Sequence, residues 1–193
     1  TALDTKRLVL ALGNAEELAI PEWARHVELV RHVYDPAFHR GHLLRAKQAV
    51  IVGGGVAAAQ LASWRARHSG PPVQLVSRSP LRVAQFDSDP CYIGPRCVRA
   101  FLEEPEAVGR SKILAEARNP GTVPPDAAAE LREHIRAGRI IHLVDPITDA
   151  ALMPGEGTVT LFTASGRELT ADLVVLATGF GTVRPGNELL SQL

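Results

Sequence analysis

The fold of this chain is decided by the stretch Ala49-Val50-Ile51-Val52-Gly53-Gly54-Gly55-Val56-Ala57-Ala58-Ala59. Four apolar residues predict a buried strand, three glycines follow at once, and a run of small residues then predicts a helix. With the spacing counted, the stretch is G-x-G-x-x-A on Gly53, Gly55 and Ala58. A strand before this pattern and a helix after it form the context that a dinucleotide-binding turn requires.

Each small residue of the pattern has a physical role. Gly53 allows the tight turn, Gly55 lets a pyrophosphate approach the backbone, and Ala58 lets the helix pack close to its strand. The free N–H groups and the dipole at the helix N-terminus favour the anion. The alternative is a glycine-rich turn without a ligand. Gly53, Gly54 and Gly55 are predicted to contact the pyrophosphate, and the predicted cofactor-binding residues of this stretch are Gly53, Gly54, Gly55, Val56, Ala57 and Ala58.

The next residues complete a strand–helix–strand unit. A helix is predicted from Val56 to Arg67, and Ser69-Gly70-Pro71-Pro72 ends it because proline cannot continue a helix. The apolar run 73–77 then predicts a second buried strand. Two strands joined by a crossover helix are the minimal nucleotide-binding unit.

The end of this second strand indicates which dinucleotide is bound. An acidic residue there would select NAD by binding the ribose hydroxyls. This chain has Ser77-Arg78-Ser79, and the next carboxylate is Asp87. The Arg78 guanidinium suits a phosphate, and the two serines add hydroxyl donors. The sequence therefore favours NADPH over NADH and disfavours FAD at this site; the alternative is a solvated arginine in a loop.

Composition excludes several classes of function. The chain has 193 residues, 46% of them apolar, and a formal net charge of zero, so nothing indicates nucleic-acid binding. No apolar run reaches the roughly 18 residues of a membrane helix, and the segment after Thr1 lacks the apolar core of a signal peptide. We expect a cytoplasmic protein without a membrane partner.

The cysteines and histidines suggest no metal. Cys91 and Cys97 are farther apart than redox-active pairs, which disfavours a disulfide reductase, and zinc needs more ligands. We expect two reduced thiols. His32, His39 and His42 lie in loop-like sequence, so we expect no metal site there.

The remaining elements predict an α/β fold, a Rossmann-like three-layer parallel sheet with a small antiparallel hairpin. Two similar apolar segments, 7–14 and 172–180, are predicted to be strands, and their parts Leu8–Leu12 and Leu173–Thr178 are expected to lie close together. The sequence between 14 and 47 is predicted to be a helix-poor linker. Helices are expected at 97–103, 107–118 and 127–137, the last capped by Asp126, a strand at 139–144, and a hairpin of 158–163 with 168–170.

These motifs resemble the NADPH-binding portion of two-dinucleotide-domain flavoproteins, which include flavin-containing monooxygenases and pyridine nucleotide oxidoreductases. The matching residues are Gly53, Gly55, Ala58, Arg78 and the closing Ala177-Thr178-Gly179-Phe180. The segment from Asp87-Ser88-Asp89-Pro90 to Asn119 is similar in outline to the insertion of amine N-hydroxylating monooxygenases, although Ile93-Gly94 stands where that family has Asn-Glu. The resemblance implies that Thr178 and Gly179 also border the cofactor.

The resemblance also implies a domain organisation. Residues 1–47 would be a strand and linker leaving an FAD domain, 48–147 an NAD(P)-binding domain with an insertion at 80–125, and 148–193 a hairpin and a strand returning to the FAD domain. Since only one glycine fingerprint is present, we expect a fragment of a larger flavoprotein, with FAD bound only in the intact protein. The missing FAD domain would leave apolar surface for self-association.

The resulting hypothesis is an NADPH- and FAD-dependent oxidoreductase, a monooxygenase, in which this chain positions NADPH for hydride transfer to flavin. The chain alone would be inactive, and a small-molecule substrate would bind in the intact protein. The alternative is a non-catalytic NADP(H)-binding or sensing module. No residue pattern of known catalytic chemistry is visible in the sequence, so no catalytic residue is assigned.

Overall fold

The computed structural model describes residues 6–7, 9–13, 17–153, 155–181, 186 and 190. The chain forms two compact units. One combines Thr1–Ala19 with Gly179–Leu193, and the other is Ile20–Thr178. All the helices and strands named below belong to the larger unit.

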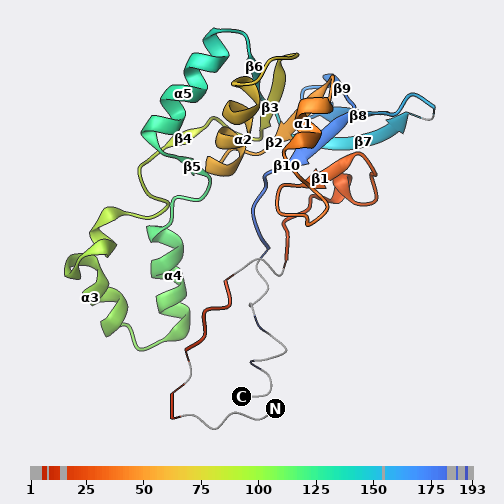
Figure 1. The fold of residues 1–193 in the computed structure, drawn as a ribbon. Coiled ribbons are helices and arrows are strands. Elements are labelled where there is room, and N and C mark those ends of the chain that lie inside the picture. The colour runs from red at the N-terminus through yellow and green to blue at the C-terminus, as the bar shows by residue number, and fades with distance from the viewer. Residues whose placement is uncertain are drawn as a thin grey trace. The chain divides into compact units, whose positions relative to one another are not determined.

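A parallel sheet forms the centre of the larger unit (Figure 1). Among the described residues it has five strands, in the order β1-β10-β2-β3-β6. Every neighbouring pair is parallel, as the apolar runs of the sequence predict for strands buried on both faces. The strands are β1 (Val30–His32), β2 (Ala49–Val52), β3 (Val73–Ser77), β6 (Ile140–Val144) and β10 (Leu173–Leu176).

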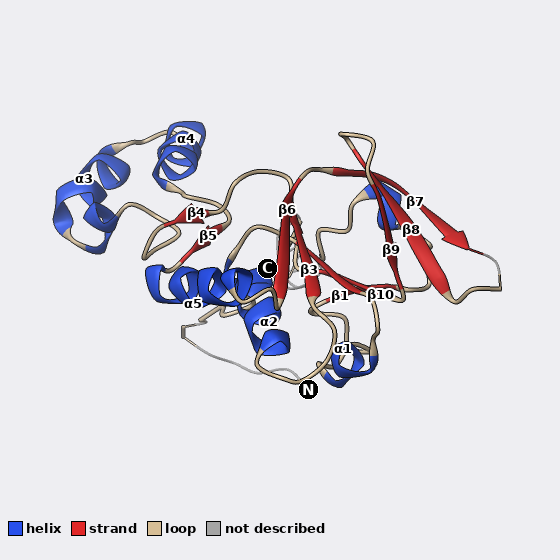
Figure 2. Cartoon of the chain, turned by 90° about the horizontal axis from the view of Figure 1, so that it is seen from above, coloured by secondary structure: helices blue, strands red, loops and turns tan. Residues whose placement is uncertain are grey.

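Alternate residues of these strands build two separate hydrophobic clusters. Ile51, Leu75 and Val175 pack on the helices α2 (Val56–Ala66) and α5 (Pro125–Arg136). Val50 and Val174 pack against a second, antiparallel sheet. Figure 2 shows the helices α2 and α5 and this second sheet on different sides of the parallel sheet. The predicted three-layer α/β fold is therefore confirmed.

The antiparallel layer is larger than the predicted hairpin. It has the order β7-β8-β9, made of β7 (Ile147–Met153), β8 (Thr158–Thr163) and β9 (Glu168–Ala171). The hairpin of β8 and β9 is confirmed, but β7 was not predicted. Most of its side chains are exposed, so its sequence lacks the apolar alternation that marks a half-buried strand.

Helix α2 follows the prediction closely and is buried on most of its surface. It includes Arg65, whose side chain is only 2% exposed. The Arg65 guanidinium donates to the carbonyls of Leu43 at 3.0 Å, His68 at 3.3 Å and Pro71 at 3.1 Å. A buried charge is tolerated where hydrogen bonds replace its hydration. Arg65 thereby holds the end of α2 against the short helix α1 (Gly41–Arg45).

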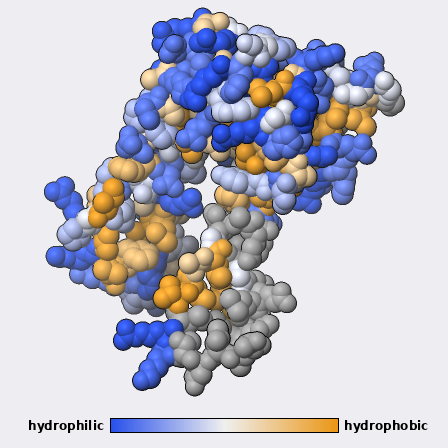
Figure 3. Space-filling model, viewed as in Figure 1, coloured by the Kyte–Doolittle hydropathy of each residue, from blue (hydrophilic) through white to orange (hydrophobic). Residues whose placement is uncertain are grey.

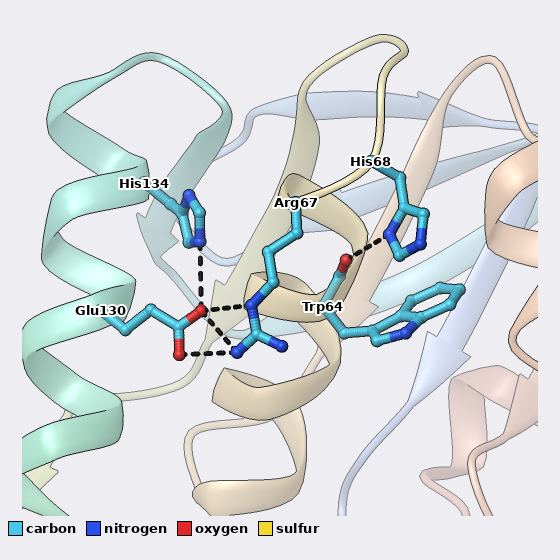
Figure 4. Close-up of polar contacts among 5 residues, drawn as sticks. All are labelled: Trp64, Arg67, His68, Glu130 and His134. Atoms are coloured by element: carbon cyan, nitrogen blue, oxygen red, sulfur yellow. Dashed lines mark hydrogen bonds and ion pairs between the residues drawn. The ribbon is translucent and has the colours of Figure 1, made fainter.

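Helix α5 packs on α2 and is tied to it by a polar network (Figure 4). Arg67 donates to both carboxylate oxygens of Glu130, at 2.7 and 2.8 Å. Nε2 of His134 lies 3.3 Å from the same carboxylate. Burial raises the pKa of Glu130, but the hydrogen bonds from Arg67 and His134 outweigh it and hold that pKa below its usual value.

The start of α5 differs from the prediction. Its N-cap is Pro124, which makes no side-chain capping bond, and Asp126 lies inside the first turn. The prediction that Asp126 is the cap was wrong because Pro125 is itself the first helical residue, a position that suits proline.

The insertion between β3 and α5 is helical and contains an unexpected disulfide. It is built from β4 (Arg82–Val83), the 3-10 turn η2 (Pro90–Ile93), α3 (Pro95–Glu103), α4 (Ala107–Ala117) and β5 (Thr122–Val123). Cys91 and Cys97 form a disulfide, with their Cα atoms 5.4 Å apart. The prediction of two reduced thiols was wrong, because the break at Gly94 brings η2 against the first turn of α3.

Large apolar side chains are exposed on this insertion (Figure 3). They include Ile93, Leu102, Val108 and Leu114, which are between 48% and 82% exposed. Apolar surface of this kind is where a partner or a second copy would pack, and self-association stays a prediction.

The N-terminal part of the chain differs most from the prediction. Residues 9–13 have no regular secondary structure, and Val9 is 87% exposed. Leu8 and Asn14 lie outside the described residues. The neighbours of β10 are β1 and β2, so the expected strand at 7–14 is not its sheet partner. Instead, the predicted linker supplies the edge strand β1, together with the 3-10 turn η1 (Glu22–Ala24) and α1.

Within the part of the chain that the structure describes, no helix combines the length and apolar character that crossing a membrane would require.

Candidate functional site

The three glycines lie at the carboxyl edge of the parallel sheet. Val52, the last residue of β2, pairs with Leu176 of β10 on one side and with Val76 of β3 on the other. The chain reaches β3 through α2, whereas β10 returns from the far end of the sequence. The turn therefore emerges where the strand order reverses, which is the position at which open parallel sheets bind ligands.

Gly53 is required by the fold itself. Its φ is +154°, and a Cβ there would lie 2.5 Å from the carbonyl oxygen of Ala177 and 3.1 Å from Cβ of Ala58. Its N–H donates to the carbonyl of Val76 at 2.9 Å. A side chain at this position would clash with the residue after β10 and with α2. This agrees with the roles predicted from the sequence, in which Gly53 allows the tight turn and Ala58 allows close packing of the helix.

Gly54 and Gly55 meet no comparable obstacle. A Cβ on Gly54 would lie 3.6 Å from Cβ of Ser77, and one on Gly55 would lie 3.5 Å from Cα of Gly121. Both are ordinary van der Waals distances, and the φ of Gly55, −101°, is open to any residue. Packing within the described residues thus leaves room for a side chain at both positions. The absent side chains leave an open cradle, and a Cβ at either position would occupy part of that space.

The N-terminus of α2 has donors but no anion of its own. Gly55 is its N-cap and makes no side-chain capping bond, and the first turn contains no acidic residue. The helical bonds begin with Ala59, whose N–H donates to the carbonyl of Gly55 at 3.1 Å. Of the predicted contacts in this turn, Val56 is exposed, Ala57 is half-buried and Ala58 is buried. The earlier N–H groups of such a turn favour an anionic ligand.

The end of β3 presents one cation. Arg78 and Ser79 are exposed, and no ion-pair partner of Arg78 is found among the described residues. Ser77 is only 2% exposed. Its hydroxyl donates to the carbonyl of Ser79 at 2.8 Å and lies 2.9 Å from Nε2 of His142. Of these three residues, Arg78 therefore presents the positive charge, and the Ser77 hydroxyl is engaged within the protein.

Thr178 and Gly179 fall on either side of the division between the two units. Thr178 follows Ala177, whose N–H donates to the carbonyl of Val52 at 2.7 Å, so Thr178 leaves the sheet beside the glycine turn. Gly179, with a φ of +84°, belongs to the other unit, where its carbonyl accepts from the N–H of Ala19 at 3.0 Å. The cofactor contacts of both residues stay predictions.

The structure also places residues at the turn that sequence reasoning missed. Gly121 faces Gly55, and Leu81 lies beside Gly54. His142 reaches the turn's neighbour Ser77 from β6. The sequence marks Gly121 only as part of a helix-breaking Pro-Gly pair, and nothing in it indicates that the end of the insertion returns to the glycines.

The described residues contain no group of three or more acidic, cysteine or histidine side chains arranged to hold a metal. The rings of His39 and His42 stack with their centroids 3.8 Å apart. Desolvation and the nearby His39, Arg45 and Arg31 lower the pKa of His42. His32 lies in β1, with its Nδ1 accepting from the N–H of Tyr34 at 3.3 Å.

Three solved structures of oxidoreductases share this architecture with the chain. An ornithine N-hydroxylase from Kutzneria sp. 744, in complex with reduced FAD, NADP+ and L-ornithine, is 20% identical to this chain. Its TM-score is 0.61, over 86% of this chain and 44% of that chain. A cadaverine monooxygenase of desferrioxamine biosynthesis from Erwinia amylovora, bound to FAD, is 16% identical, with a TM-score of 0.66 over 89% of this chain and 44% of that chain. A pyridine nucleotide-disulfide family oxidoreductase from Enterococcus faecalis V583 is 10% identical, with a TM-score of 0.50 over 90% of this chain and 31% of that chain.

The chain has the fold of part of a flavin monooxygenase. The resemblance predicted from the glycine turn, Arg78 and the closing strand is thus confirmed at the level of the fold. The chain spans less than half the length of both monooxygenases. No family model matches the sequence, and no curated protein matches it either.

Proposed function

We propose that this chain is the NADPH-binding part of an FAD-dependent oxidoreductase of the monooxygenase type. The observation that carries the proposal is the open cradle of Gly54 and Gly55 at the uncapped N-terminus of α2, at the point where the strand order reverses. The similar solved structures support it, because the Kutzneria enzyme is in complex with reduced FAD and NADP+, and the Erwinia enzyme is bound to FAD.

Each part of the site has a distinct task in this proposal. The N–H groups at the start of α2 bind the pyrophosphate, and the missing side chains of Gly54 and Gly55 allow its approach. The exposed Arg78 binds the 2′-phosphate, which distinguishes NADPH from NADH. Bound NADPH supplies a hydride for a flavin. The chain contributes the binding and the orientation of the nucleotide.

The remainder of the intact protein would hold FAD and the substrate. The Kutzneria and Erwinia enzymes are more than twice as long as the part this chain matches, which supports a further FAD domain. The 193-residue sequence contains a single G-x-G-x-x-A turn, so we expect the chain to bind NADPH and to hold no FAD.

Calorimetric titration of the chain with NADPH and with NADH tests the proposal. We expect one NADPH per chain, and an affinity for NADPH at least about tenfold above that for NADH, since a charge-assisted contact contributes roughly 1.5–3 kcal/mol. Equal affinity for both nucleotides, or no binding at millimolar concentration, would contradict it. In the intact protein under anaerobic conditions, NADPH should bleach the flavin absorption. A flavin-free intact protein that still binds NADPH would instead indicate a non-catalytic NADP(H)-binding module.

A further inference from the structure

A chain of hydrogen bonds connects β6 to the loop that carries Arg78. Its centre is the buried hydroxyl of Ser77, which lies 2.8 Å from the carbonyl oxygen of Ser79 and 2.9 Å from Nε2 of His142. A carbonyl oxygen only accepts, so the hydroxyl must donate its single proton to Ser79. Nε2 of His142 must therefore donate to the hydroxyl oxygen.

The contact with Ser77 requires a proton on Nε2 of the His142 ring. Burial lowers the pKa of His142, which favours the neutral imidazole near neutral pH. A neutral imidazole has a single N–H, and the hydrogen bond to Ser77 places it on Nε2. A protonated ring would keep the same donor, so both protonation states of His142 preserve the contact.

The loop after β3 is therefore anchored by both the main chain and the side chain of Ser77. The main-chain carbonyl of Ser77 accepts from the N–H of Asp145 at 2.9 Å, just after β6. The Ser77 side chain closes the turn onto Ser79. Arg78 lies between these two anchored serines with its own side chain exposed. No ion pair among the described residues fixes its guanidinium, so the backbone of the loop sets only the point and direction from which the Arg78 side chain extends.

We propose that His142 is a positioning residue for nucleotide selectivity, holding the Ser77–Ser79 loop so that Arg78 meets the 2′-phosphate of NADPH. This inference rests on the proposed function. A loop whose backbone is already ordered loses less conformational freedom when its cation binds a phosphate, so the binding is tighter. NADH lacks the 2′-phosphate and gains nothing from the placement of Arg78. His142 should therefore affect the affinity for NADPH and leave that for NADH unchanged.

Three variants test the proposal by titration with both nucleotides. His142→Phe removes the donor, and we expect the NADPH-to-NADH affinity ratio to fall by roughly three- to tenfold, the effect of one neutral hydrogen bond. His142→Gln keeps an N–H donor and should restore most of the ratio. Ser77→Ala breaks the same chain of hydrogen bonds at its centre, and it provides the test if His142→Phe fails to fold.

A double variant separates positioning from general stability. If His142 acts through Arg78, adding His142→Phe to Arg78→Ala should cause no further loss of NADPH affinity. An additional loss, an unchanged ratio in His142→Phe and Ser77→Ala, or equal weakening of both nucleotides would overturn the role of His142. A wild-type chain that binds neither nucleotide would instead refute the proposed function, and with it this inference.

Discussion

Helices α2 and α5 pack against each other, but their N-termini are built in opposite ways. Helix α5 begins with Pro125, which has no N–H, and carries Asp126 in its first turn. The chain thus supplies its own negative charge there and removes one free donor. Helix α2 begins after three glycines and has no acidic residue in its first turn. Neither helix has a side-chain capping bond. The difference shows which helix end is left for an external anion.

We expect the largest loss of NADPH affinity from a side chain placed at the N-terminus of α2. Gly55→Val should weaken NADPH binding by about a hundredfold or more, equivalent to roughly 2.7 kcal/mol, because the side chain occupies the pyrophosphate space. Gly55→Ala should fold normally, since its Cβ meets Gly121 at 3.5 Å, and should show an intermediate loss. Calorimetry measures both. Wild-type affinity in Gly55→Val would place the site elsewhere.

Removing the cation beside the N-terminus of α2 should have the next largest effect. Arg78→Ala should weaken NADPH binding about ten- to a hundredfold and leave NADH unchanged, because the lost contact is charge-assisted and specific to the 2′-phosphate. Arg132→Ala is the matched control, since it removes one exposed charge from α5. An unchanged NADPH-to-NADH affinity ratio in Arg78→Ala would exclude this role.

Gly53 and Gly54 allow a test of the turn without a ligand. Gly53→Ala should lower the free energy of unfolding by about 1–3 kcal/mol, since the new Cβ would meet the Ala177 carbonyl at an unfavourable φ. Gly54→Ala has room for its Cβ and should be neutral, or stabilising by about 0.4–1 kcal/mol. Urea denaturation compares them, and equal stabilities would show that Gly53 is not required by the fold.

The smallest effect should come from the contact that joins the two helices. Glu130→Gln removes the ion pair with Arg67 and should cost about 0.2–1 kcal/mol, because Arg67 is 56% exposed. The pKa of Glu130 is lowered in the folded state. Its contribution is therefore present above the unfolded pKa, about 4.3, and is lost as pH falls through the folded value. Urea denaturation at neutral and acidic pH should show the variant and the wild type converging in acid, and a constant difference would refute the linkage.

Sequence reasoning succeeded where apolar runs and helix breakers agree. The strands β2, β3 and β10 are short, mostly apolar runs, and the helix α2 begins directly after Gly55 and ends shortly before Gly70 and Pro71. It failed for residues 9–13, because an apolar run forms a strand only where a sheet edge is available, and β1 and β2 occupy both sides of β10. The strand β1 itself is three residues long, Val-Arg-His, and has no detectable period.

The candidate site also contains residues that the sequence predicts and residues that it does not. The glycines and Ala58 lie in one short stretch, and Arg78 directly follows the next predicted strand, so sequence spacing locates them. Gly121 and His142 reach the site through the return of the insertion and through the pairing of β3 with β6. Those long-range contacts leave no local pattern. The Cys91–Cys97 disulfide was missed for a related reason, since the break at Gly94 that brings the cysteines together is a matter of backbone geometry.

The most direct test is a backbone amide NMR titration of the chain with NADPH. We expect the amide resonances of Gly55, Val56 and Ala57 to shift most, and the shifts to saturate at one nucleotide per chain. We also expect Asp126 and its neighbours in the first turn of α5 to stay unchanged, as an internal control. Shifts confined to α5, or none at the start of α2 at saturating NADPH, would contradict the claim that the uncapped end of α2 is the anion site.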